Sequence, residues 1–151
     1  YFNNSAINIS NGDINGDGSS DIIGAIEFNG FAYYGSSSYT PPEITNLSPS
    51  QNAISVNKSS DIVITFNQNM NALTLNTENI IVNGIYSGVI PASITYDATL
   101  RTLTLDPVID FKTGEKVFVL LKSGIMSENN ASLTPFIFSF ITSATGGSGS
   151  F

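Results

Sequence analysis

The stretch "DIVITF", residues 61–66, places Ile62, Ile64 and Phe66 on one side of an extended chain and more varied residues on the other. This period of two predicts a β-strand with one face in a hydrophobic core. Four more stretches have strand character: "ASITYD" (92–97), "LRTLTLDP" (100–107), "KVFVLL" (116–121) and "FIFSFIT" (136–142). Only "NMNALTLN" (69–76) suits a helix, and then a single turn. The pattern predicts an all-β antiparallel sandwich.

The predicted core follows from the apolar positions of these strands. It consists of Ile62, Ile64, Phe66, Leu103, Leu105, Phe118, Leu120, Phe136, Phe138 and Phe140.

The charge balance limits the partners of the protein. Among 151 residues there are five basic and twelve acidic side chains, which gives a net charge of −7. Without a basic patch the chain cannot release the counterions of a nucleic acid. No apolar stretch approaches the ~20 residues of a membrane-spanning helix. We therefore expect neither nucleic-acid binding nor membrane insertion.

The chain contains no Cys and no His. This excludes thiol nucleophiles, imidazole bases, disulfides and the usual ligands of zinc, copper and iron. Carboxylate and amide oxygens remain, and they suit hard cations such as Ca²⁺. The composition is compatible with a bacterial surface protein. Because the chain begins at Tyr1 without a signal-like segment, we expect a processed chain or an excised piece.

A calcium loop is predicted in "NGDINGDGSSD", residues 11–21. The oxygen side chains of Asp13, Asn15, Asp17 and Asp21 occupy positions 1, 3, 5 and 9, and the carbonyl of Ser19 occupies position 7. A polar turn without metal can also be rich in Asx and Gly residues. Four oxygen side chains at this spacing are much rarer in such turns and favour calcium.

The continuation of the loop is not that of an EF-hand. Position 12, where an EF-hand has a bidentate Glu, is Gly24, and the following "DIIGAIEF" has strand character. Asn29-Gly30 between apolar segments predicts a two-residue hairpin turn.

Residues 1–38 resemble the FG-GAP/VCBS repeat, the blade of integrin-α-type β-propellers. The resemblance lies in "GDINGDGSSDIIGA" (12–25) and "FAYYG" (31–35). It implies that Ca²⁺ is held by the five residues of the loop named above. A single blade cannot close a propeller, so we expect neighbouring repeats or a second copy to complete it.

Residues 41–142 resemble bacterial Ig-like domains of the type called Big_5 or SbsA-like. The landmarks include "PPEITNLSPSQNAISVNKSSDIVITFNQNMN" (41–71) and "FKTGEKVFVLLKSGIMSENNASL" (111–133). The predicted organisation is a blade-like calcium-binding β-hairpin unit at 1–38, a Pro-containing linker at 39–42, an Ig-like sandwich at 43–142 and a Gly/Ser-rich linker at 143–151.

Three further sets of side chains are candidate sites. Asp106 and Asp110 flank a Pro-containing turn, where Asp commonly accepts backbone hydrogen bonds, so we expect no catalysis there. The lysines are interpreted as solvated charges at strand edges, and the tyrosines mainly as packing residues, with sugar stacking as the alternative. They are Lys58, Lys112, Lys116 and Lys122, and Tyr33, Tyr34, Tyr86 and Tyr96.

The sequence thus predicts a non-enzymatic, extracellular structural or adhesive module of a large repetitive bacterial surface or filament-forming protein. Its partners would be neighbouring repeats or copies of itself, with a surface glycan or a host cell partner as further candidates. The alternative is an accessory, carbohydrate-binding part of a secreted hydrolase.

Overall fold

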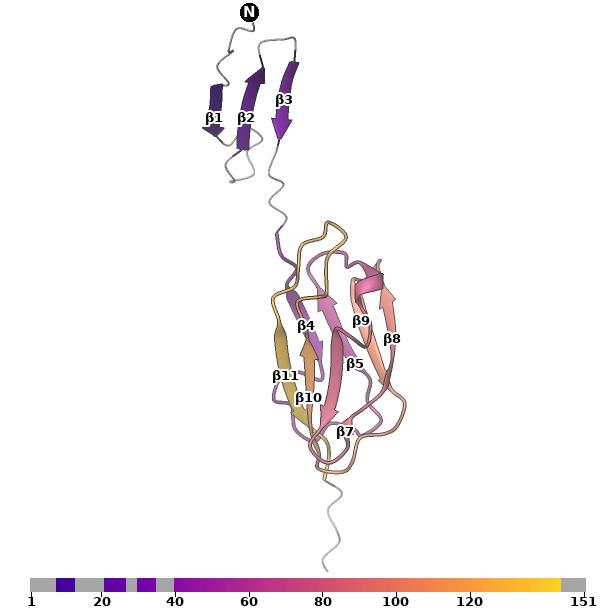
Figure 1. Cartoon of the computed structure of the whole chain (residues 1–151). Coiled ribbons are helices and arrows are strands. Elements are labelled where there is room, and N and C mark those ends of the chain that lie inside the picture. Colours follow the sequence, from indigo (N-terminus) through magenta and orange to yellow (C-terminus); the bar gives the residue numbers. More distant parts are fainter. Residues whose placement is uncertain (1–7, 13–20, 27–29, 35–39, 145–151) are drawn as a thin grey trace, which may run out of the picture. The chain divides into compact units, whose positions relative to one another are not determined.

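The computed structural model describes residues 8–12, 21–26, 30–34 and 40–144, and the chain divides into two compact units, residues 1–40 and 41–151. We call them the N-terminal unit and the sandwich. All described strands pair in antiparallel sheets, and the longest helical element is a single 3₁₀ turn (Figure 1). No helix in the described part of the chain is long and apolar enough to cross a membrane.

The N-terminal unit contains a three-stranded sheet of order β1-β2-β3. Its strands are β1 (Asn8–Gly12), β2 (Asp21–Ile26) and β3 (Gly30–Tyr34). Gly12 pairs with Asp21 at one end of the sheet. At the other end Ile26 pairs with Gly30, which confirms the predicted hairpin between these strands. Because Gly30 already belongs to β3, the predicted two-residue length of the Asn29-Gly30 turn is wrong. The connection between β2 and β3 is residues 27–29.

The sandwich consists of two four-stranded sheets, of order β11-β10-β6-β7 and β4-β5-β9-β8. The predicted antiparallel sandwich is therefore confirmed. The strands of the first sheet are β6 (Ile80–Gly84), β7 (Gly88–Val89), β10 (Lys116–Leu121) and β11 (Phe136–Ile141). Those of the second are β4 (Ile44–Ser48), β5 (Ile62–Phe66), β8 (Ala92–Asp97) and β9 (Thr102–Pro107).

The helical turn predicted within 69–76 is the 3₁₀ helix η1 (Ala72–Thr74). Asn71, its N-cap, accepts a hydrogen bond from the backbone N–H of Leu73, and the helix ends at Leu75, whose ψ of 78° is not helical.

The core lies between the two sheets and is filled by aliphatic and Phe side chains. Within it, Phe111 meets Phe140 edge to face, with ring centroids 5.5 Å apart. Ile62, Ile64, Phe66, Leu103, Leu105, Phe138 and Phe140 are buried as predicted, and Phe136 packs at the margin.

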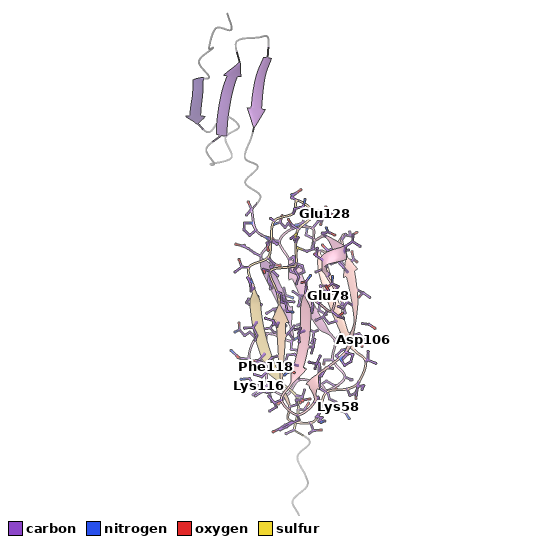
Figure 2. The ribbon with its side chains drawn as sticks, in the orientation of Figure 1. Lys58, Glu78, Asp106, Lys116, Phe118 and Glu128 are labelled. Carbon is purple, nitrogen blue, oxygen red and sulfur yellow. The ribbon has the colours of Figure 1, made fainter. Side chains whose placement is uncertain are left out.

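The predicted core face of β10 is wrong. Phe118 and Leu120 are only half-buried, whereas Val117, Val119 and Leu121 are fully buried. Both faces of "KVFVLL" are apolar, so alternation alone does not choose between them, and a one-residue shift exchanges the faces. Lys116 decides the choice, because it shares the face of Phe118 and keeps its ammonium group 5.2 Å from the Phe118 ring centroid at the surface (Figure 2).

Candidate functional site

Most of the predicted calcium ligands lie outside the described residues: Asp13, Asn15, Asp17 and Ser19. Asp21 is the first residue of β2 and pairs with Gly12, the last residue of β1. The two ends of the loop are therefore held at the spacing of paired strands, about 5 Å between Cα atoms. The metal site stays a prediction. In residues 40–144, no group of three or more acidic side chains is arranged to hold a metal.

The most unusual polar side chain in the sandwich is Glu115, which is fully buried. Its Oε1 accepts hydrogen bonds from the backbone N–H groups of Tyr86 (2.9 Å) and Ser87 (2.7 Å). Its Oε2 accepts from the backbone N–H of Lys112 (2.9 Å) and from the Ser87 hydroxyl (3.0 Å). Four donors thus converge on one carboxylate, which joins the β6–β7 turn to the turn before β10.

Burial raises the pKa of Glu115, but the hydrogen bonds from Lys112, Tyr86 and Ser87 more than offset this and hold the pKa below its ordinary value of 4.5. The group is therefore ionised at neutral pH. Because both oxygens are saturated with donors, the carboxylate has no position left from which to take a substrate proton. Glu115 stabilises two turns and does not act as a base.

Gly84 makes room for this carboxylate. A Cβ atom added at Gly84 would lie 2.2 Å from Oε1 and 2.5 Å from Cδ of Glu115. The carboxylate cannot move aside without breaking its hydrogen bonds, so a residue with a side chain at position 84 would clash with it. Glu115 was not among the predicted sites, since a single Glu after a Gly in a polar turn is common; the only signal was an acidic residue directly before an apolar strand.

The carboxylates of Asp106 and Asp110 do not form a catalytic pair. Asp106 and Asp110 are both exposed. Asp110 lies 3.8 Å from the ammonium of Lys58, with both side chains more than half exposed, an arrangement that contributes little energy. Asp106, Lys58, Glu78 and Glu128 are dispersed along the sandwich surface (Figure 2).

The prediction that the four lysines lie at strand edges is wrong. Lys116 belongs to β10, an inner strand between β11 and β6. Lys112 and Lys122 flank β10 in turns, where their ammonium groups donate to the carbonyls of Tyr86 and Glu78, both at 2.8 Å. Lys58 lies in a turn. The edges of the two sheets are therefore not guarded by lysine.

The two tyrosines of the sandwich, Tyr86 and Tyr96, lie in different environments. Tyr96 is partly buried, and its hydroxyl accepts a hydrogen bond from the backbone N–H of Met70 at 2.9 Å. Tyr86 is exposed. Tyr33 and Tyr34 belong to β3 in the N-terminal unit.

An apolar groove opens on one side of the sandwich, between the edges of its two sheets. It has a volume of about 220 Å³ and is lined by β6, the β7–β8 segment and β8, including Ile81, Val89, Pro91 and Ile94. Val89 is 71% exposed at its margin. A second groove of about 230 Å³ shares Val89 and Pro91 and extends to Ile109. These grooves suit an apolar contact, because few polar groups converge there.

The sequence profile of the bacterial Ig-like domain family (Big_5) matches residues 38–142. No curated protein matches the chain. The FG-GAP/VCBS resemblance of residues 1–38 stays a prediction.

Solved structures share the fold of the sandwich. The surface layer protein SbsC, domains 1–6, is 12% identical with a TM-score of 0.53, and the match covers 69% of this chain and 14% of SbsC. CopC from Methylosinus trichosporium OB3b is 14% identical with a TM-score of 0.52, covering 70% of this chain and 97% of CopC. The LD transpeptidase LdtMt1 is 14% identical with a TM-score of 0.50, covering 69% of this chain and 41% of the enzyme. At such identities the likeness concerns the fold alone.

Proposed function

The chain belongs to the bacterial Ig-like domain family, and we propose that it is a non-catalytic structural segment of a large bacterial cell-surface protein. The observation that carries this proposal is the use of Glu115. Within residues 40–144 it is the only fully buried charged side chain, and both of its oxygens are occupied in holding two turns. The labelled charged side chains Lys58, Glu78, Asp106 and Glu128 lie apart on the sandwich (Figure 2).

The likeness to a surface layer protein supports a place outside the cell. A chain without Cys needs no oxidative folding, and the sandwich is stabilised by its continuous core of apolar side chains. A domain with its own closed core suits a spacer or building segment.

Calcium has a mechanical role in this proposal. The N-terminal unit carries four acidic and no basic side chains, and three of its acids lie between the end of β1 and the first residue of β2. Bound Ca²⁺ would neutralise Asp13, Asp17 and Asp21 and rigidify the loop, with Asn15 and the Ser19 carbonyl completing the ligand set. Folding of this unit would then be linked to the metal.

The experiment is electron microscopy of the purified full chain, with calcium and with a chelator. The proposal expects ordered assemblies in calcium that become irregular or shorter after chelation, and an Asp17→Ala variant that behaves as the chelated protein does. Monodisperse single particles in both conditions would contradict a building segment.

A second candidate is an accessory domain of a secreted hydrolase. It is favoured by the fold likeness to LdtMt1, an enzyme of which the match covers 41%. A glycan array probed with the full chain, with and without calcium, tests it. Binding to one glycan class would favour this candidate over a load-bearing segment.

A further inference from the structure

Four strands form the edges of the two sheets in the sandwich: β11, β7, β4 and β8. An open edge offers its backbone N–H and C=O groups to another strand, and natural proteins usually block it with a bulge, a charge, a covering segment or a short strand. The four edges can therefore be compared by what blocks them.

Three of these edges are blocked. β11 is covered by residues 52–56, since Asn52 N–H donates to Ser139 O at 2.7 Å and Ile141 N–H to Ala53 O at 2.8 Å. β7 has only two residues. β4 has a bulge at Thr45.

The edge of β8 has neither a bulge nor, among residues 40–144, a paired covering segment, and its one charged residue, Asp97, lies at its last position. It pairs with β9 over six consecutive positions without a bulge, from Ala92 opposite Pro107 to Asp97 opposite Thr102. It contains no Lys or Arg, and within residues 40–144 β9 is the only strand that it pairs with. Figure 1 shows β8 at the outside of its sheet.

The phase of the ladder identifies which backbone groups of β8 are free to pair. Val108 N–H donates to Pro91 O at 2.9 Å, and residues that bond to one neighbour alternate along an antiparallel strand. Asp106 and Thr104 lie two and four residues before Val108, so their backbone groups also point toward β8. Their partners Ser93 and Thr95 are therefore the β8 residues that form hydrogen bonds with β9. The N–H and C=O groups of Ile94 and Tyr96 therefore point away from β9, and no hydrogen bond from the described residues reaches them.

The side chains of β8 keep this edge in place. Ile94 and Tyr96 pack against the core, and the Tyr96 hydroxyl is held by the Met70 N–H. Ser93 and Thr95 are exposed and uncharged on the opposite face. From Ala92 to Tyr96 the edge is thus an ordered, uncharged template beside the apolar groove and its exposed Val89.

We propose that β8 pairs antiparallel with β8 of a second copy of this chain, across a two-fold axis at Thr95. Ile94 of each copy would then exchange two backbone hydrogen bonds with Tyr96 of the other, and the two sheets would become one sheet of eight strands. This inference rests on the proposed function as a building segment and names the surface through which copies meet.

A second copy is favoured over another partner because the edge is self-complementary. In a two-fold pairing at Thr95, Thr95 faces Thr95 and each Asp97 faces Ser93, so like charges are not opposed. The Asp97 carboxylate already accepts from the backbone N–H groups of Thr99 (2.8 Å) and Leu100 (3.1 Å). Pairing would also place the two grooves, each with its Val89 side chain, on the same face of the joined sheet.

The first experiment is cross-linking of Thr95→Cys in the full chain, where it is the only thiol. Thr95 facing Thr95 would be a non-hydrogen-bonded pair with Cα atoms about 4.5 Å apart, within the range of a disulfide. The matched control is Thr45→Cys, on the opposite edge of the same sheet. Mild oxidation should give a covalent dimer of the first variant at least about tenfold faster than of the second. Equal rates would overturn the proposal.

The second experiment compares Thr95→Lys with Thr45→Lys by sedimentation equilibrium. Lysines facing each other should weaken association at least about tenfold for Thr95→Lys and little for Thr45→Lys, and a mixture of Thr95→Lys with Thr95→Glu should restore it. If the wild type associates and Thr95→Lys does so equally well, the β8 contact is wrong while the building role survives. If the wild type stays monomeric at millimolar concentration, both are wrong.

Discussion

The three strands of the N-terminal unit form one sheet, whereas the eight strands of the sandwich form two sheets around a shared core. A three-stranded sheet of five- and six-residue strands needs another layer, a partner or a ligand for stability. The sandwich contains its own second layer. The two units also differ in charge. All five basic residues of the chain lie in the sandwich, whereas the charged residues of the N-terminal unit are all acidic.

The comparison teaches that two adjoining β-units can be stabilised by different means. The sandwich depends on apolar burial and on one buried carboxylate. The N-terminal unit, in our proposal, depends on a cation that neutralises its loop. Substitutions in the core should therefore destabilise the sandwich, and removal of the metal should destabilise the N-terminal unit.

The largest effect on the sandwich is expected from Phe140→Ala. Phe140 is fully buried against Phe111, so its truncation leaves a cavity and should cost about 3–5 kcal/mol of the free energy of unfolding. Ile137→Ala in the same strand is the control, because Ile137 is 56% exposed and should cost about 1 kcal/mol or less. Urea unfolding followed by circular dichroism measures both. Equal losses would show that the core is not where the structure has it.

Glu115→Gln should come next. The amide cannot accept four hydrogen bonds from N–H and O–H donors, so we expect a loss of about 1–3 kcal/mol at neutral pH. Glu128→Gln is the control, since Glu128 is exposed.

The same pair of variants tests the sign of the pH dependence. The folded-state pKa of Glu115 lies below its ordinary value, so its contribution is present above pH 4.5 and is lost as the pH falls through the folded-state value. The difference between wild type and Glu115→Gln should narrow in urea titrations as the pH falls below 4.5. A difference that widens in acid would contradict the ionised carboxylate.

The smallest effect is expected from Phe118→Ala, and it tests the face of β10. Phe118 is half-buried beneath the Lys116 ammonium, so truncation should cost about 0.5–1 kcal/mol. Val119→Ala removes fewer atoms but empties a fully buried position and should cost about 1.5–3 kcal/mol. Thermal unfolding of the two variants gives the order. The reverse order would restore the face predicted from the sequence.

The sequence predicted the sandwich well where alternation was unambiguous. β5 and β8 have the predicted bounds or lie within them, because each has apolar side chains at every second position. β9 begins at Thr102, two residues later than the predicted stretch, because Arg101 has a positive φ of 55° in the turn before it. The face of β10 was predicted wrongly because both of its faces carry large apolar side chains; the signal for the correct choice was Lys116, which shares the face of Phe118 and Leu120.

The polar features were harder to predict than the core. Glu115 is defined by donors from residues 86, 87 and 112, which only the fold brings together. The position of Lys116 could not be predicted, because the order of strands that makes β10 an inner strand is not visible in the sequence. The pairing of Gly12 with Asp21 agrees with a loop between two strands, while the ligands between them lie outside the described residues.

The most direct test of the account is hydrogen exchange of the full chain with calcium and after chelation, read peptide by peptide by mass spectrometry. The account predicts that chelation, or Asp17→Ala in calcium, abolishes protection in β1, β2 and β3 and leaves β5, β9 and β10 unchanged. Unchanged protection in the first three strands after chelation, or equal loss in both units, would contradict it.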